Sequence, residues 1–215
     1  MQEIEDLSIG GSIRLTGPVK FRRIDLAGSL NIDGNAEGRS LEISGSGKIT
    51  GTVKVDTVDV SGTLKIRESC ECNELKISGS GEIQSAIRSN TLDVSGKLVA
   101  GSIEAHRIDL SGKLEAKEIK AYEINVEKDS RIKGTVECGT LNLEKGAEVD
   151  DVFADKVNIE KDADCGIIEC NEITVERNAE IKEVRYVKSA NISPSARVDT
   201  VTRIDKVSKD LPLKS

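Results

Sequence analysis

The stretch "VDVSGTLKI", residues 58–66, consists of two short segments of alternating apolar residues joined by a Ser-Gly corner. Alternation with a period of two predicts β-strands with one buried face. Similar phrases recur throughout the chain, for example "LEISGSGKI" at residues 41–49 and "IDLSGKLEA" at residues 108–116. The apolar residue that opens each phrase returns every 16 or 17 residues, at Leu7, Ile24, Leu41, Val58, Leu75, Leu92, Ile108, Ile124, Leu141, Val157, Ile173 and Ala190.

Each repeat contains three apolar pairs, which in the repeat from Leu92 are Leu92/Val94, Leu98/Ala100 and Ile103/Ala105. A unit of 16 or 17 residues is too short for helical repeats, which need about 34–47 residues, or for leucine-rich repeats, which need about 20–29. The pattern therefore predicts an all-β fold, a three-sided parallel β-helix of about 12 coils. Stacking at roughly 4.8 Å per coil predicts a rod roughly 55–60 Å long. We expect a right-handed coil, because parallel strand crossovers are right-handed and the period is shorter than the 18 residues of hexapeptide-based left-handed helices.

The repeat spans nearly the whole chain without a break in composition. We predict a short N-terminal tail over residues 1–6, a single β-helix domain over residues 7–204, and a C-terminal tail or cap over residues 205–215. The stretch "RIDKVSKDLPLKS" at residues 203–215 is charged and contains Pro212, which is compatible with either a cap folded over the last coil or a loose tail.

Composition argues against several classes of function. The net charge is −7, the pI is about 5.0 and only 2% of residues are aromatic, so the chain lacks the cationic surface and stacking platforms of nucleic-acid binders. No signal peptide and no apolar run of about 20 residues is visible, so we expect a cytoplasmic protein. The one histidine, His106, is predicted at an outward corner, and the five cysteines fall in core columns. We expect no catalytic residue, metal or cofactor.

Other columns suggest how the corners are built. Pairs such as Ser44-Gly45 and Ser61-Gly62 predict tight turns with positive φ at glycine. In the second half of the chain, Glu-Lys pairs such as Glu144-Lys145 replace them and predict longer, solvated corners. An outward column becomes asparagine-rich in the same half and predicts a side-chain ladder.

Phrases such as "LEISGSGKITGTVKV" and "IDLSGKLEAKEIKA", over about residues 7–204, resemble the bactofilin family of polymer-forming cytoskeletal proteins. The resemblance implies a right-handed triangular β-helix that polymerises end to end, without nucleotide, into non-polar filaments. It also implies scaffold roles in bacterial cell shape, wall-enzyme placement or motility. Its implied partners are further copies of the chain and other bactofilin-like or cell-envelope proteins.

Two features depart from the family pattern. The predicted rod has about twice the usual number of coils. The family's membrane-binding N-terminal segment has no counterpart in "MQEIED" at residues 1–6, so we expect any position near the membrane to depend on partners rather than on direct binding.

The terminal coils of a solenoid leave strand edges unpaired, and such edges template further pairing. We therefore predict self-association through the first coil and, at the other end, through the last. The candidate end-contact residues are Leu7, Ile9, Ile13, Phe21, Ile192, Val198, Val201 and Ile204.

Two other functions are compatible with a β-helix. A monomeric or dimeric adaptor could dock partner proteins on a flat face. A β-helical acyltransferase-like enzyme would need a left-handed coil, a catalytic histidine and a loop that leaves the coil, and the near-constant step leaves no residues for such a loop.

Overall fold

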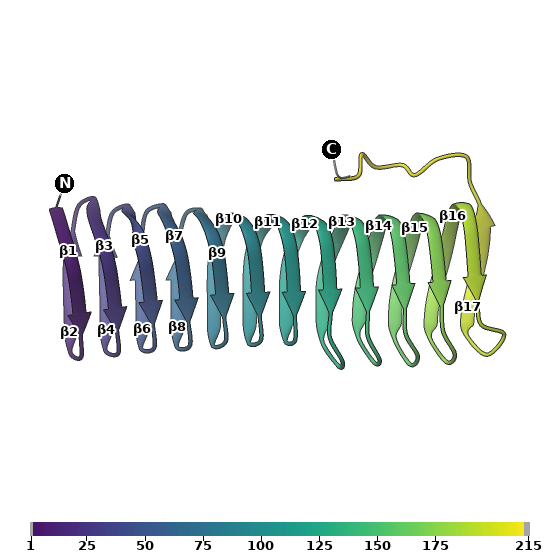
Figure 1. The fold of residues 1–215 in the computed structure, drawn as a ribbon, viewed down its shortest axis with the longest axis horizontal. Coiled ribbons are helices and arrows are strands. Elements are labelled where there is room, and N and C mark those ends of the chain that lie inside the picture. Colours follow the sequence, from purple (N-terminus) through teal and green to yellow (C-terminus); the bar gives the residue numbers. More distant parts are fainter. Residues whose placement is uncertain (1, 213–215) are drawn as a thin grey trace. The chain divides into compact units, whose positions relative to one another are not determined.

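A computed structural model describes residues 2–212, which form strands and turns with no helix (Figure 1). The chain divides into two compact units, residues 1–105 and residues 106–215, which are considered separately below. Together their described residues make about 12 turns of parallel β-solenoid, as the 16- to 17-residue period predicts. The prediction of one continuous domain over residues 7–204 stays a prediction.

Unit 1 alternates eight-residue strands with strands of four or five residues until the last turns, where the two merge. Its strands are β1 (Gln2–Ile9), β2 (Ser12–Thr16), β3 (Val19–Leu26), β4 (Ser29–Asp33), β5 (Ala36–Ile43), β6 (Ser46–Ile49), β7 (Val53–Val60), β8 (Thr63–Ile66), β9 (Cys70–Ile77) and β10 (Ser80–Val94). Equivalent positions pair in parallel, so that Leu7 lies beside Ile24 and Ile24 beside Leu41. Strand β11 (Lys97–Leu110) runs through the boundary between the units.

Unit 2 has a single long strand in most turns. These strands are β12 (Lys113–Val126), β13 (Arg131–Leu143), β14 (Glu148–Ile159), β15 (Asp164–Val175), β16 (Glu180–Ile192) and β17 (Arg197–Arg203). Each pairs in parallel with the next, as in the series Ile124, Leu141 and Val157.

The predicted inward positions form the core of each unit. In β7, the eight residues alternate between buried and exposed except at two adjacent exposed residues in the middle, where the strand turns a corner. This pattern fits three sides per turn, while the handedness stays a prediction. Residues 2–6, for which the sequence predicts a tail, belong to β1, because Gln2, Glu3 and Ile4 continue the pairing with β3.

All five cysteines are buried, as the core columns predict. Burial, with a smaller effect of the Glu169 charge, raises the pKa of Cys170 to about 12. At pH 8 this thiol holds on the order of a thousandfold less thiolate than a free cysteine. We therefore expect a thiol reagent to leave Cys170 unlabelled in native protein for hours and to label it promptly in guanidinium. Prompt native labelling at this site, read by peptide mass spectrometry, would contradict the buried placement.

The structure gives the corner glycines a different role from the predicted one. None of the glycines in the Ser-Gly and Ala-Gly corners has a positive φ. A Cβ built on Gly45 would lie 2.0 Å from the carbonyl oxygen of Gly28, and one on Gly62 would lie 2.0 Å from that of Gly45. The prediction of positive φ was therefore wrong: glycine is needed because the backbone of the preceding coil passes where a side chain would begin.

The Glu-Lys corners of unit 2 are joined by hydrogen bonds between neighbouring coils. The Glu144 carboxylate accepts the backbone N–H of Lys128 at 3.1 Å, and the Glu160 carboxylate accepts that of Lys145 at 3.2 Å. Positive φ occurs in these turns, at Asp129, Asp162 and Asn178 among the non-glycine residues. Aspartate and asparagine tolerate this conformation better than most residues do.

The predicted asparagine ladder is present in unit 2. Asn142 donates to the Asn125 side-chain oxygen at 2.8 Å and accepts from Asn158 at 2.8 Å, and Asn125 donates to Asp109 at 2.8 Å. All four side chains are half-buried, so each bond replaces water that the stacked coils displace.

Replacing Asn142 with alanine should lower the free energy of unfolding by about 1–2 kcal/mol, because two ladder neighbours lose a hydrogen-bond partner at once. Chemical denaturation followed by circular dichroism measures this change. Asn191→Ala is the matched control, since Asn191 lies in the same outward column but is exposed. Equal effects at the two positions would contradict a stabilising role for the ladder.

Candidate self-assembly surfaces

The first coil of unit 1 leaves core side chains partly uncovered. Leu7 in β1 and Ile13 in β2 are half-buried, whereas their partners one coil further on, Ile24 and Leu30, are 0% and 1% exposed. In Figure 1, no further strand of unit 1 lies beyond β1 and β2. Ile9, 7% exposed, is the best covered of the predicted contacts in these two strands.

The column of corner glycines is open at the same place. A Cβ built on Gly28 would lie 1.9 Å from the Gly11 carbonyl oxygen, but one built on Gly11 would have no described atom within 4 Å. Inside unit 1, successive corner carbonyls accept a backbone N–H of the next coil: Gly28 accepts from Ser46 at 2.9 Å and Gly45 accepts from Thr63 at 2.8 Å. The first coil therefore presents both apolar side chains and a corner that another backbone could approach.

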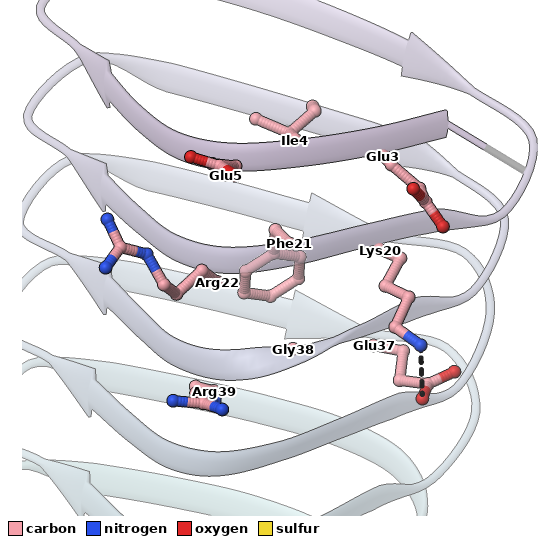
Figure 2. A pocket seen from close by; sticks show the side chains of 9 residues that line it. All are labelled: Glu3, Ile4, Glu5, Lys20, Phe21, Arg22, Glu37, Gly38 and Arg39. Carbon is pink, nitrogen blue, oxygen red and sulfur yellow. Dashed lines mark ion pairs between the residues drawn. The ribbon is translucent and has the colours of Figure 1, made fainter.

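Phe21 lies one coil inside this edge. It belongs to β3, pairs with Ile4 and is 4% exposed. Figure 2 shows Phe21 between Ile4 and Gly38 in a shallow hollow, and a Cβ on Gly38 would lie 2.5 Å from the ring. The sequence prediction placed Phe21 in the first coil because it did not include residues 2–6 in a strand.

Charged side chains of both signs surround the hollow in Figure 2. Lys20 pairs with Glu37 at 3.8 Å, and the Arg22 guanidinium contacts the Asp6 carboxylate. These pairs are exposed, so each stabilises the fold by no more than about 1 kcal/mol. They link neighbouring coils and leave the apolar edge of β1 and β2 uncovered.

The last coil of unit 2 is also open. Val201 in β17 is 47% exposed, whereas its partner Val184 in β16 is 0% exposed. Val198, Ile192 and Ile204 are half-buried, and the pairing of β17 with β16 extends to Arg203. The segment that follows lies against β13–β15 of the same unit (Figure 1), so it does not cover Val201.

The single histidine takes part in a ring contact. His106 is exposed and stacks on Tyr122, with ring centroids 5.3 Å apart and an interplanar angle of 16°. Among residues 2–212, no group of three or more His, Cys, Asp or Glu side chains is arranged to hold a metal ion.

Residues 4–98 match the family model of the bactofilins, described as polymer-forming cytoskeletal proteins. The resemblance to bactofilins is confirmed for this segment. The bactofilin match lies within unit 1 and includes the open first coil.

A solved structure, the C-terminal domain of a tapirin from Caldicellulosiruptor hydrothermalis, is similar with 13% sequence identity and a TM-score of 0.49. The alignment covers 98% of this chain and 59% of the tapirin chain. No curated protein matches this sequence. In the described part of the chain, no helix has the length and apolar character needed to cross a membrane.

One feature of unit 2 was missed at the level of sequence. An outward column with the same 16- to 17-residue step holds Lys120, Glu137, Phe153, Glu169 and Arg185, and the C-terminal segment lies on it. The repeat register could have revealed this column, because its members pair in consecutive strands. The docking of the segment has no periodic signal.

Proposed function

We propose that this chain is a non-enzymatic structural protein that self-assembles through its terminal coils into nucleotide-independent cytoskeletal filaments or scaffolds. The observation that carries the proposal is a contrast in core burial. Core side chains of the first coil are partly exposed, whereas their partners in the neighbouring coil are fully buried. The bactofilin match supports it, because that family is described as polymer-forming and the matched segment contains this coil. We further propose that the protein works in the cytoplasm, as a scaffold in cell shape, wall-enzyme placement or motility.

The physical drive for assembly is the same as the drive that stacks coils within each unit. A second copy placed on the first coil would pair the free edges of β1 and β2 and cover Leu7 and Ile13. Full burial of an aliphatic side chain contributes about 1.5–3 kcal/mol relative to full exposure, so these half-buried residues have part of that gain still available. We propose homotypic contacts, first coil to first coil and last coil to last coil, which give filaments without polarity.

Negative-stain electron microscopy of the purified chain tests this proposal. We expect filaments or sheets to form without added nucleotide, at a width set by the solenoid cross-section. Uniform single particles at all protein concentrations would overturn it. Filaments that persist unchanged when both Leu7 and Val201 carry a charge would show assembly through another surface.

A further inference from the structure

The C-terminal segment, residues 204–212, turns back after β17 and runs across the strands of unit 2 (Figure 1). Its first residue, Ile204, donates its backbone N–H to the Tyr186 carbonyl at 2.8 Å. Further along, the Ser208 backbone N–H donates to the Glu169 carboxylate, and the Lys209 ammonium lies 2.8 Å from Glu137. The segment is therefore held by specific polar contacts to β15 and β13.

The surface beneath it is a single outward column, which we term the charged ladder: Lys120, Glu137, Phe153, Glu169 and Arg185. Consecutive members pair across β12 to β16, so the column crosses the strands in the direction of the segment. It places an aromatic ring between two carboxylates and a cation at each end. The order of side chains thus suits a ligand with a cation at its centre.

The two carboxylates are nearly inaccessible even though their column faces outward. Glu137 is 2% exposed and Glu169 is 4% exposed. A buried carboxylate is costly unless it is paired, and the pairs here come from both the ladder and the segment. Lys120 lies 3.1 Å from Glu137 on one side, and Lys209 lies 2.8 Å from it on the other. Burial alone would raise the pKa of Glu137, but Lys209 and Lys120 hold that pKa below its ordinary value.

Apolar and small groups complete the site. The Lys209 ammonium lies 5.6 Å from the centre of the Phe153 ring, within the range of a cation–π contact. At the far end of the segment, a Cβ built on Gly139 would lie 3.0 Å from the Pro212 carbonyl oxygen. Along the segment, the site thus offers three successive contacts. Glu169 accepts a backbone N–H, Phe153 contacts a lysine, and Gly139 leaves room for the backbone to pass closely.

We propose that the charged ladder is a binding site for an extended, lysine-containing peptide, and that residues 204–212 of a second copy occupy it in exchange for the chain's own segment. Every copy carries both the site and its ligand, so binding within and between copies uses the same contacts. The two modes differ only in the effective concentration of the segment near the site. For the segment of a second copy, this concentration rises when copies are held together. The exchange links copies through a side surface and does not require the terminal coils.

The site is tested first with a fluorescent peptide of residues 204–212 and full-length protein carrying Lys209→Glu, which places a carboxylate of the chain's own segment against Glu137. We expect this variant to bind the peptide at least tenfold more tightly than wild type, whose site is already occupied. The single variant Glu137→Lys should not bind this peptide, because a lysine of the peptide would then face a lysine of the site. It should instead bind a peptide with Glu in place of Lys209. Circular dichroism confirms that each variant is folded.

Exchange between copies is tested by mixing full-length Lys209→Glu, which has a free site, with full-length Glu137→Lys, which has a free segment. We expect tagged Lys209→Glu to retain at least threefold more Glu137→Lys chain than it retains of itself. Self-association through the terminal coils contributes equally to both mixtures, so the excess reports the segment. Equal retention would overturn exchange between copies, and failure of the peptide to bind folded Lys209→Glu protein would overturn the site.

Discussion

Replacing Gly62 with alanine should destabilise unit 1 by roughly 3 kcal/mol or more, whereas the same change at Gly11 should cost less than about 0.5 kcal/mol. The new methyl group at residue 62 would lie 2.0 Å from the Gly45 carbonyl oxygen and 2.4 Å from that of Ser44. These are backbone atoms fixed by the strands on either side, so the coils would have to separate. At Gly11 the methyl group meets no described atom within 4 Å.

The two glycines occupy equivalent corners, which makes them a matched pair. Thermal and guanidinium unfolding of the two variants beside wild type measures the difference. If Gly62→Ala were as stable as Gly11→Ala, the close stacking of the corners would be wrong. If the reverse order were found, the first coil would already be covered in the isolated protein.

Placing a charge on either terminal coil should stop assembly at dimers. Leu7→Glu would put a carboxylate on the proposed first-coil contact, and Val201→Glu would do so on the proposed last-coil contact. Each residue is partly exposed in its own unit, so we expect a loss of folding stability below about 1 kcal/mol. Homotypic contacts predict that each single variant retains one working surface and forms dimers, observable by size-exclusion chromatography with light scattering.

The matched controls are the residues that pair with Leu7 and Val201 in the neighbouring coil of the same unit. Ile24→Glu and Val184→Glu bury an unpaired charge at positions that are 0% exposed, so each should cost about 3–5 kcal/mol of folding stability. Monomers from both Leu7→Glu and Val201→Glu would instead indicate that the first coil of one copy binds the last coil of the next. Unchanged filaments from either variant would remove that coil from the contact.

Much of the fold could be predicted because a solenoid converts sequence spacing directly into neighbours. The step from Leu7 to Ile24 to Leu41 gives both the strand pairing and the core, and the asparagine column gives a hydrogen-bonded ladder. The sequence correctly placed glycines at the corners, but the predicted reason, a positive φ, was wrong. In the sequence, a glycine required by close backbone approach between coils looks the same as a glycine required by a tight turn.

The candidate site could be predicted only where it follows the repeat. Leu7, Ile13 and Val201 were identifiable because each opens or closes a column of otherwise buried residues. Phe21 was placed one coil too far out, because the weakly patterned residues 2–6 were not recognised as a strand. Lys209 lies outside the periodic region, so its contact with Glu137 depends on a chain path that spacing does not encode.

Sedimentation velocity over a hundredfold range of protein concentration tests the central claim most directly, with wild type and the double variant Leu7→Glu/Val201→Glu measured side by side. Open terminal coils predict that the wild-type sedimentation coefficient rises steeply with concentration, while the double variant stays at the value of a folded monomer or of a small complex linked by the C-terminal segment. A wild-type chain that sediments as a monomer throughout, or a double variant that polymerises like wild type, would contradict assembly through the terminal coils.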